Sequence, residues 1–236
     1  MPLTLKNFNS TWGGWWQPWA NTIAYYPLNW DLNDYSGNDR HLTWSWVTYT
    51  PWWPWQVASF SSSSTAYYTN QSLFNISYPF TYSFYIKSSN VPTTYYQTNL
   101  PYRMWAITIT DGNTLWTFDK YAGLAAWWLY GYNYYGSSCA TWWWTINNDT
   151  WYHCVYTFDG LKEKLYLNWS LVSEKNCWGS HTWYSNATFR LAHQIQSGDS
   201  IYFNWQLSNV IVENVAWSAQ EVSDYFDITK SLYGIS

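Results

Sequence analysis

Short runs of alternating apolar and polar residues recur along this 236-residue chain, and they constrain its fold more than any other feature. The runs are rich in Tyr, Thr, Phe and Val and are bounded by turn-forming residues, which is typical of β-strands with a buried face. No helical periodicity separates them. The clearest runs are 22–28, 80–87, 152–158, 164–168 and 207–212. We therefore predict an all-β fold, a two-sheet antiparallel sandwich or jelly roll.

One helix is expected near the C-terminus. Ser218 and Glu221 have the spacing of a capping box, in which each side chain bonds the backbone N–H of the other residue. Val222, Tyr225 and Phe226 then fall on one helical face. We predict a short C-terminal helix over about 219–226, within one domain that spans 21–236. Residues 1–20 lack periodicity and are expected to form a flexible lead segment.

Tryptophan is unusually abundant, with 23 residues against 11 glycines. Trp30, Trp169 and Trp205 each follow an asparagine where a turn is expected, and tight hairpin turns favour glycine there because φ is positive. We hypothesise that many tryptophans stand for glycine, through a UGA codon that the source reads as glycine. The lead segment would then be rich in glycine. The alternative is a Trp-rich protein that uses aromatic side chains as binding platforms.

Charge and cysteine content exclude several classes of protein. Ten Lys and Arg against 14 Asp and Glu give a net charge of −4, which argues against a nucleic-acid partner. No 18-residue apolar run is present to insert into a membrane. Three cysteines are too few for a disulfide framework. Cys154 is expected in the core, and a Cys139–Cys177 bridge is one alternative for the other two.

Several motifs, in order, resemble those of a known superfamily. They are AYYPLNW at 24–30, DYSGN at 34–38, WYHCVYTFDG at 151–160, LYLNW at 165–169, LSNVIV at 207–212 and WSAQEV at 217–222. Over about residues 22–234 the chain resembles the laminin-G-like branch of the concanavalin A-like lectin/glucanase superfamily. The resemblance implies two antiparallel sheets packed face to face, one of them concave. It also implies that Trp151 is a genuine tryptophan and that glycine is usual at positions 30, 169 and 205.

Catalytic residues are not expected. A retaining glucanase on this scaffold needs two carboxylates about 5 Å apart across a groove. None of the glutamates, Glu163, Glu174, Glu213 and Glu221, has the Glu-x-Asp-x-x-Glu spacing of the enzymes in this superfamily. The four histidines show no metal-binding spacing, and no Gly-x-Ser-x-Gly nucleophile motif is present. We therefore predict a non-catalytic protein, with a glycoside hydrolase as the less favoured alternative.

A calcium site is one interpretation of an early turn. Many laminin-G-like domains hold calcium at the rim of the sandwich, and calcium prefers carboxylate and carbonyl oxygens. Asp31, Asp34, Asn38 and Asp39 crowd one glycine-containing turn, and Asp34 and Asn38 are the candidate ligands. The alternative is that Asp34 and Asn38 form Asx turns that shape the loop.

Strand alternation also predicts a ligand-binding surface. In the run at 80–87, Phe80, Tyr82, Phe84 and Ile86 should face the core, and Tyr85 should face the other side. The same reasoning places His153 and Tyr166 on that side, where sugar rings would stack on aromatic side chains. The alternative is an ordinary sheet surface covered by loops.

Two function classes follow. The first is a recognition module outside the cell that binds glycans or a surface partner. The second is a phage virion protein, part of the tail or a capsid decoration, that uses the same sandwich to face a host. Residues 1–20 lack the basic and apolar regions of a secretory signal, which favours the virion because virions leave by lysis. Neighbouring genes for tail or capsid proteins, or for adhesins and secretion, would separate the two.

Overall fold

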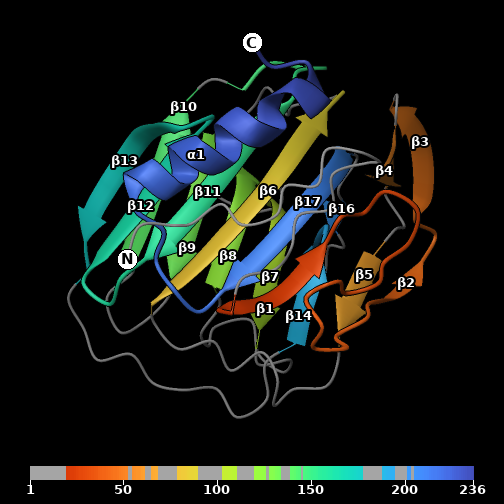
Figure 1. Ribbon diagram of the computed structural model, residues 1–236, viewed down its shortest axis with the longest axis horizontal. Coiled ribbons are helices and arrows are strands. Elements are labelled where there is room, and N and C mark those ends of the chain that lie inside the picture. The colour runs from red at the N-terminus through yellow and green to blue at the C-terminus, as the bar shows by residue number, and fades with distance from the viewer. Residues whose placement is uncertain are drawn as a thin grey trace.

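Each alternating run of the sequence forms a β-strand in the computed structural model. The structure describes residues 20–52, 55–61, 65–68, 79–89, 103–110, 120–125, 128–133, 139–144, 146–177, 188–194, 201–202 and 205–236. Within these ranges the strands form two antiparallel sheets that pack face to face, and one helix crosses the outer side of one sheet (Figure 1). The predicted sandwich with a C-terminal helix is therefore confirmed.

The sheet beneath the helix, here called the covered sheet, has the strand order β13-β12-β11-β6-β17-β4-β3, and β1 also pairs with β17. Its strands are β1 (Thr22–Tyr26), β3 (Thr48–Trp52), β4 (Trp55–Phe60), β6 (Phe80–Ser88), β11 (Tyr152–Phe158), β12 (Lys162–Leu167), β13 (Ser170–Asn176) and β17 (Trp205–Glu213). The central strands β6, β11 and β17 are buried along almost their whole length, because both faces of the sheet are covered there.

The opposite sheet has the order β10-β9-β8-β7-β14-β5-β2. Its strands are β2 (Thr43–Ser45), β5 (Thr65–Tyr68), β7 (Arg103–Thr110), β8 (Lys120–Ala125), β9 (Trp128–Asn133), β10 (Cys139–Trp144) and β14 (Thr188–Leu191). A short ribbon of β15 (His193–Gln194) and β16 (Ile201–Tyr202) forms a separate pair.

The main core lies between the two sheets. The side chains that alternation assigned to the inside of β6 are buried there together with Cys154, Tyr156 and Phe158 of β11. Cys154 is a free buried thiol, and Cys177 is disulfide-bonded. Phe80 packs on Tyr156 with ring centroids 5.7 Å apart. Burying such aromatic side chains supplies most of the driving force for the sandwich.

A second core lies on the outer side of the covered sheet. Helix α1 (Ala219–Thr229) and the 3-10 helix η2 (Lys230–Tyr233) cross β11 and β6, whereas β4 and β3 extend beyond them (Figure 1). Val222 and Tyr225 of α1 pack with Val155 of β11 and Ile211 of β17 in one buried cluster. The capping box is present, because Glu221 N donates to Ser218 Oγ and Ser218 N donates to Glu221 Oε2. The helix extends three residues beyond the predicted 219–226.

The three turn predictions for tryptophan have different outcomes. Trp169 lies in a turn with a φ of 68° and is 49% exposed, as a glycine-type position requires. Trp30 lies outside the strands and is exposed, but its φ is not positive. The prediction for Trp205 is wrong, because Trp205 begins β17 and is 2% exposed in the main core. Trp151 is buried, as expected of a genuine tryptophan. Residues 1–19 of the predicted lead segment lie outside the described residues.

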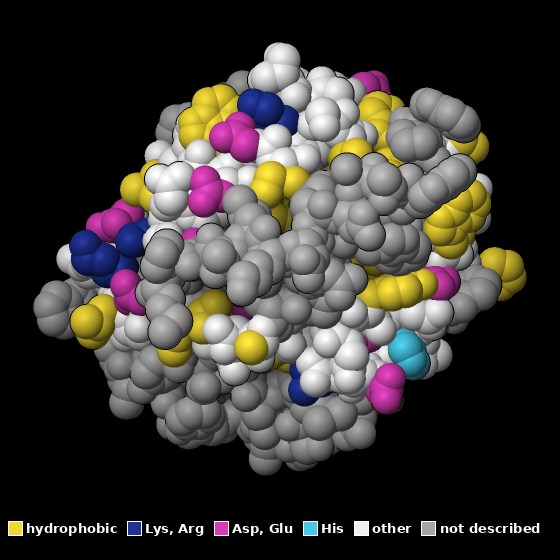
Figure 2. Space-filling view, in the orientation of Figure 1, with side chains coloured by type: hydrophobic (Ala, Val, Ile, Leu, Met, Phe, Trp, Pro, Cys, Tyr) yellow, Lys and Arg dark blue, Asp and Glu magenta, His cyan; other side chains and the backbone are white. Residues whose placement is uncertain are grey.

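Charged side chains gather at one edge of the covered sheet. Figure 2 shows basic and acidic groups side by side at the left, over β12 and β13. Lys162 Nζ lies 2.7 Å from Glu174 Oε1, and Lys164 Nζ lies 3.9 Å from Glu174 Oε2. No helix in the described ranges is long and apolar enough to cross a membrane.

Candidate functional site

The three residues predicted to bind a ligand lie beneath α1 and η2. Tyr85, His153 and Tyr166 are each at most 1% exposed. The ring of Tyr85 stacks on Tyr233 of η2 at 3.7 Å and on His153 at 4.7 Å between centroids. Tyr85 and Thr229 of α1 share a hydrogen bond of 2.5 Å between their hydroxyl oxygens. The prediction of an open aromatic surface at these residues is therefore wrong: they occupy the predicted side of the sheet, but the helix covers that side.

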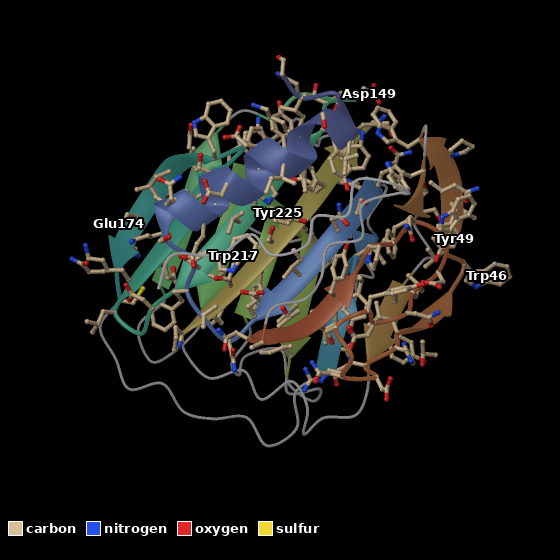
Figure 3. The ribbon with its side chains drawn as sticks, viewed as in Figure 1. Trp46, Tyr49, Asp149, Glu174, Trp217 and Tyr225 are labelled. Carbon is tan, nitrogen blue, oxygen red and sulfur yellow. The ribbon has the colours of Figure 1, made fainter. Side chains whose placement is uncertain are left out.

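The ionisable side chains between the helix and the sheet have pKa values that are shifted by burial, as in a protein core. Ser83 Oγ and His153 Nε2 lie 2.8 Å apart, and burial lowers the pKa of His153 to about 3, so the ring is neutral. Burial also raises the pKa of Tyr166. Figure 3 shows Trp217 and Tyr225 beneath α1, against the sheet. The sequence predicted an apolar helix face, which needs a surface to cover, but it did not indicate which side of the sheet this would be.

Asp34 and Asn38 hold the early turn together through hydrogen bonds. Asp34 Oδ1 accepts from the backbone N–H groups of Tyr25 and Ser36, and Oδ2 accepts from Ser36 Oγ and from Arg40 N. These four donors occupy the lone pairs that a carboxylate offers. Asn38 Nδ2 donates to the backbone oxygen of Thr22 at 2.9 Å. The arrangement matches the Asx-turn alternative and does not fit a calcium ion held by Asp34 and Asn38.

Next to this turn the surface has an open hollow, here called the aromatic pocket. Four separate segments line it: Tyr25, Pro27 and Asn29 from β1 and the following loop, Trp52, Trp55, Gln56 and Val57 from the β3–β4 hairpin, Ser208 and Asn209 from β17, and Leu232 and Tyr233 from η2. The pocket therefore lies where η2 ends and the outer side of β4 is left uncovered. Its residues are separated in sequence, so no local motif announces them.

A chain of hydrogen bonds fixes one wall of the aromatic pocket. Tyr25 Oη donates to Asn209 Oδ1 at 3.0 Å, and Asn209 Nδ2 donates to Tyr233 Oη at 2.8 Å. Tyr233 Oη in turn donates to Ser208 Oγ at 2.8 Å, and Ser208 Oγ donates to the backbone oxygen of Pro27 at 3.1 Å. Asn209 has a φ of 48° at an irregularity in the pairing of β17 with β6, which turns its amide into the pocket wall. Burial raises the pKa of Tyr25 far above its usual value, so this wall is uncharged.

The other wall consists of indole rings. Trp52 and Trp55 face each other as the last pair of the β3–β4 ladder, and both side chains are partly exposed. Trp52 Nε1 donates to the backbone oxygen of Leu232 at 2.8 Å, which joins the hairpin to η2. Two polar atoms of pocket-lining residues, Trp55 Nε1 and Asn29 Oδ1, are buried and have no hydrogen-bond partner among the described residues. Such groups cost free energy unless a partner reaches them.

Two glutamates are buried in the covered sheet, on its opposite faces. Glu163 pairs with Phe158 of the main core, whereas Glu213 lies under α1, where its Oε2 accepts from Trp217 Nε1 at 2.6 Å. Burial raises the pKa of Glu163 to about 8 and that of Glu213 to about 7. A sheet separates them, so they cannot act together across a groove as a glycosidase pair does. Among the described residues, no three His, Cys, Asp or Glu side chains gather where they could hold a metal ion.

Comparison with solved structures identifies the architecture. Domain 4 of AbnA, a GH43 extracellular arabinanase from Geobacillus stearothermophilus solved with arabinotriose, matches with a TM-score of 0.63 and 15% identity, over 86% of this chain and 97% of that domain. The binding domain of Paraclostridial Mosquitocidal Protein 1 gives a TM-score of 0.67 and 15% identity, over 91% of this chain and 55% of that one. The binding domain of Botulinum neurotoxin DC in complex with SialylT gives 0.64 and 14%, over 90% and 52%. This chain thus spans about half the length of the toxin binding domains.

No curated protein matches the sequence significantly. A family model described as the concanavalin A-like lectin/glucanases superfamily matches residues 60–223, which is more than half of the chain. The match includes the central strands β6, β11 and β17 of the covered sheet and the first turn of α1. The chain therefore belongs to the concanavalin A-like lectin/glucanases superfamily.

Proposed function

We propose that the protein is a non-catalytic recognition module that binds glycans in the aromatic pocket. The observation that carries the proposal is the pairing, in one hollow, of the partly exposed rings of Trp52 and Trp55 with the unpartnered polar atoms Trp55 Nε1 and Asn29 Oδ1. A sugar presents an apolar ring face and a rim of hydroxyl groups. The indole rings suit the ring face, and the two polar atoms suit the hydroxyl groups.

The similar structures support this proposal at the level of fold. The arabinanase domain matches over 97% of its length and was solved with a bound trisaccharide. The titles of the toxin structures describe binding domains, one of them in complex with SialylT, but only about half of each matches this chain. The arabinanase domain is therefore the more direct support for a glycan partner.

We place the module outside the cell or on a virion. Cys177 is disulfide-bonded, and disulfide bonds persist in oxidising surroundings. The similar arabinanase is described as extracellular. Either location would present the aromatic pocket to host or environmental glycans.

We also propose that some tryptophans occupy positions encoded as glycine. Trp46 and Trp169 have φ values of 58° and 68° and are 74% and 49% exposed, which is costly for a bulky residue and natural for glycine. Neither Trp52 nor Trp55 has a positive φ, and Trp52 donates a hydrogen bond through its ring nitrogen. The backbone therefore accommodates tryptophan without strain at both positions, and we treat Trp52 and Trp55 of the aromatic pocket as genuine tryptophans.

The test of glycan binding is a glycan array followed by titration calorimetry on the strongest hit. Trp55→Phe keeps an aromatic ring but removes the Nε1–H donor, so it should weaken binding by up to about tenfold. Trp55→Ala removes the stacking surface as well and should weaken binding further.

Trp46→Phe is the matched control, because Trp46 is highly exposed at the edge of the molecule (Figure 3) and does not line the pocket. It should leave the affinity unchanged. Failure of every glycan to bind, or equal affinity of the Trp55 and Trp46 variants, would refute the proposed site.

A further inference from the structure

A second hollow lies beside the aromatic pocket, and Ser59, Lys87, Asp149 and Gln206 contribute to its lining. This hollow lies one step further along β17 and β4, the paired strands that also line the aromatic pocket. In the ladder between β17 and β4, Gln206 faces Ser59, while Ser208 and Val57 line the aromatic pocket. Residues two apart on a strand share a face and lie about 7 Å apart, so the two hollows are neighbours on one side of the sheet.

Trp52 lies between the two hollows. Its ring lines the aromatic pocket, and Lys87 Nζ from the second hollow lies 4.9 Å from the ring centroid. Lys87 Nζ also lies 5.9 Å from the ring of Trp151, so the ammonium group is held between two indole faces. A partly exposed ring with a hollow on each side is suited to a chain of sugars that crosses it.

The second hollow has its own groups for hydrogen bonding. Gln206 Oε1 is buried without a hydrogen-bond partner among the described residues. Lys87 forms no ion pair with the described acidic side chains. Asp149 also lines the hollow, on a turn anchored by a hydrogen bond of 2.6 Å from Asp149 N to the backbone oxygen of Ser88. Residues with donor and acceptor groups thus line the hollow together.

We propose that the two hollows form one extended site for a linear oligosaccharide of at least two sugar units, with one unit in the aromatic pocket and the next beside Lys87 and Gln206. This proposal rests on the proposed glycan function and adds the length of the ligand.

The experiment measures affinity against ligand length. Linear gluco-, xylo- and arabino-oligosaccharides of one to six units are tested on an array, and the binding series is titrated by calorimetry. Affinity should rise about tenfold or more between one unit and two or three, and then level off, because the second hollow adds its own hydrogen bonds.

Two variants locate the second subsite. Lys87→Met and Gln206→Leu should each weaken the binding of the longer sugars by up to about tenfold and leave the single unit unchanged. Lys175→Met, on the exposed strand β13, is the matched control and should bind every length as the parent does. Circular dichroism confirms that each variant is folded.

The outcomes separate this proposal from the one before it. Binding that depends on Trp55 but not on ligand length, Lys87 or Gln206 would overturn the extended site and keep the glycan function. Weaker binding of a single unit in Lys87→Met would mean that the two hollows do not hold separate units, and it would also overturn the extended site. Absence of binding by any series would overturn both proposals.

Discussion

Trp169 occupies the second position of a two-residue turn between β12 and β13. Asn168 and Trp169 have φ values of 51° and 68°, the combination of a type I′ turn, in which glycine is the favoured second residue. The exposed indole packs on Phe226, with ring centroids 5.1 Å apart, which offsets part of the backbone strain. The side chain therefore has a contact, although the backbone is better suited to glycine.

Trp169→Gly should raise the free energy of unfolding by about 1 kcal/mol, since the left-handed conformation costs a non-glycine residue about that much or more. Chemical denaturation measures the change. Trp151→Gly is the contrasting variant: Trp151 is buried and lies 5.0 Å from the ring of Tyr233, so its loss should cost about 3–5 kcal/mol. A less stable Trp169→Gly variant would contradict the glycine assignment at this turn, and mass spectrometry of the native protein would decide which residue it carries.

Glu213 makes stability depend on pH. Burial raises its pKa from 4.5 to about 7, although the hydrogen bonds from Trp217 and Thr22 act in the opposite direction. A carboxyl whose pKa is higher in the folded state stabilises the fold fully below the unfolded pKa, and this contribution is lost as the pH rises through the folded value. Glu163, with a pKa near 8, acts with the same sign.

Glu213→Gln should therefore flatten the decline of unfolding free energy between about pH 4.5 and 7. The amide can still accept from Trp217 Nε1 and can donate to Thr22 Oγ1, so the fold should persist. The lowered pKa of His153 reduces the unfolding free energy at acid pH. Because the parent and the variant both contain His153, this effect cancels in the difference between their unfolding free energies. Urea denaturation of the parent and the variant across this range provides the measurement, and parallel curves would argue against a titrating Glu213.

At the scale of elements, α1 and η2 hold the second core and one wall of the aromatic pocket. Ser218→Ala removes the side-chain half of the capping box and should lower the unfolding free energy by about 1 kcal/mol. Hydrogen exchange should then rise first in α1, η2 and the β3–β4 hairpin, because Trp52 is bonded to Leu232. Ser231→Ala, at an exposed position of η2, is the control and should change neither quantity. An increase in hydrogen exchange that is equal along the whole chain of the Ser218→Ala variant would mean that the helix does not support the pocket.

The elements were more predictable than the site. Alternation located β6 and β11 and assigned the correct face to Tyr85 and His153, because strand periodicity is a local property. What covers that face is decided by the docking of a helix more than 60 residues away from His153 in the sequence, which periodicity does not report. Trp205 was misassigned for a related reason: a preceding asparagine favours a turn, but pairing with β4 and β6 imposes a strand.

The aromatic pocket escaped prediction because four distant segments build it. Trp52 and Trp55 come to line one pocket because they are partners in the β3–β4 hairpin. Asn209 gave no signal at all, since its role depends on an irregularity in β17.

At the scale of the whole molecule, the outer strands of the covered sheet determine how well two copies can join edge to edge. β3 ends one side of the sheet and carries Pro51, which has no N–H to offer a further strand. β13 ends the other side, where Glu174 and Lys175 place charge along the edge. Two copies are therefore poorly suited to join edge to edge through this sheet. If several copies were attached to one support, each copy would bind its own sugar. The overall strength of attachment to a sugar-coated surface would then grow with the number of sugars bound at once.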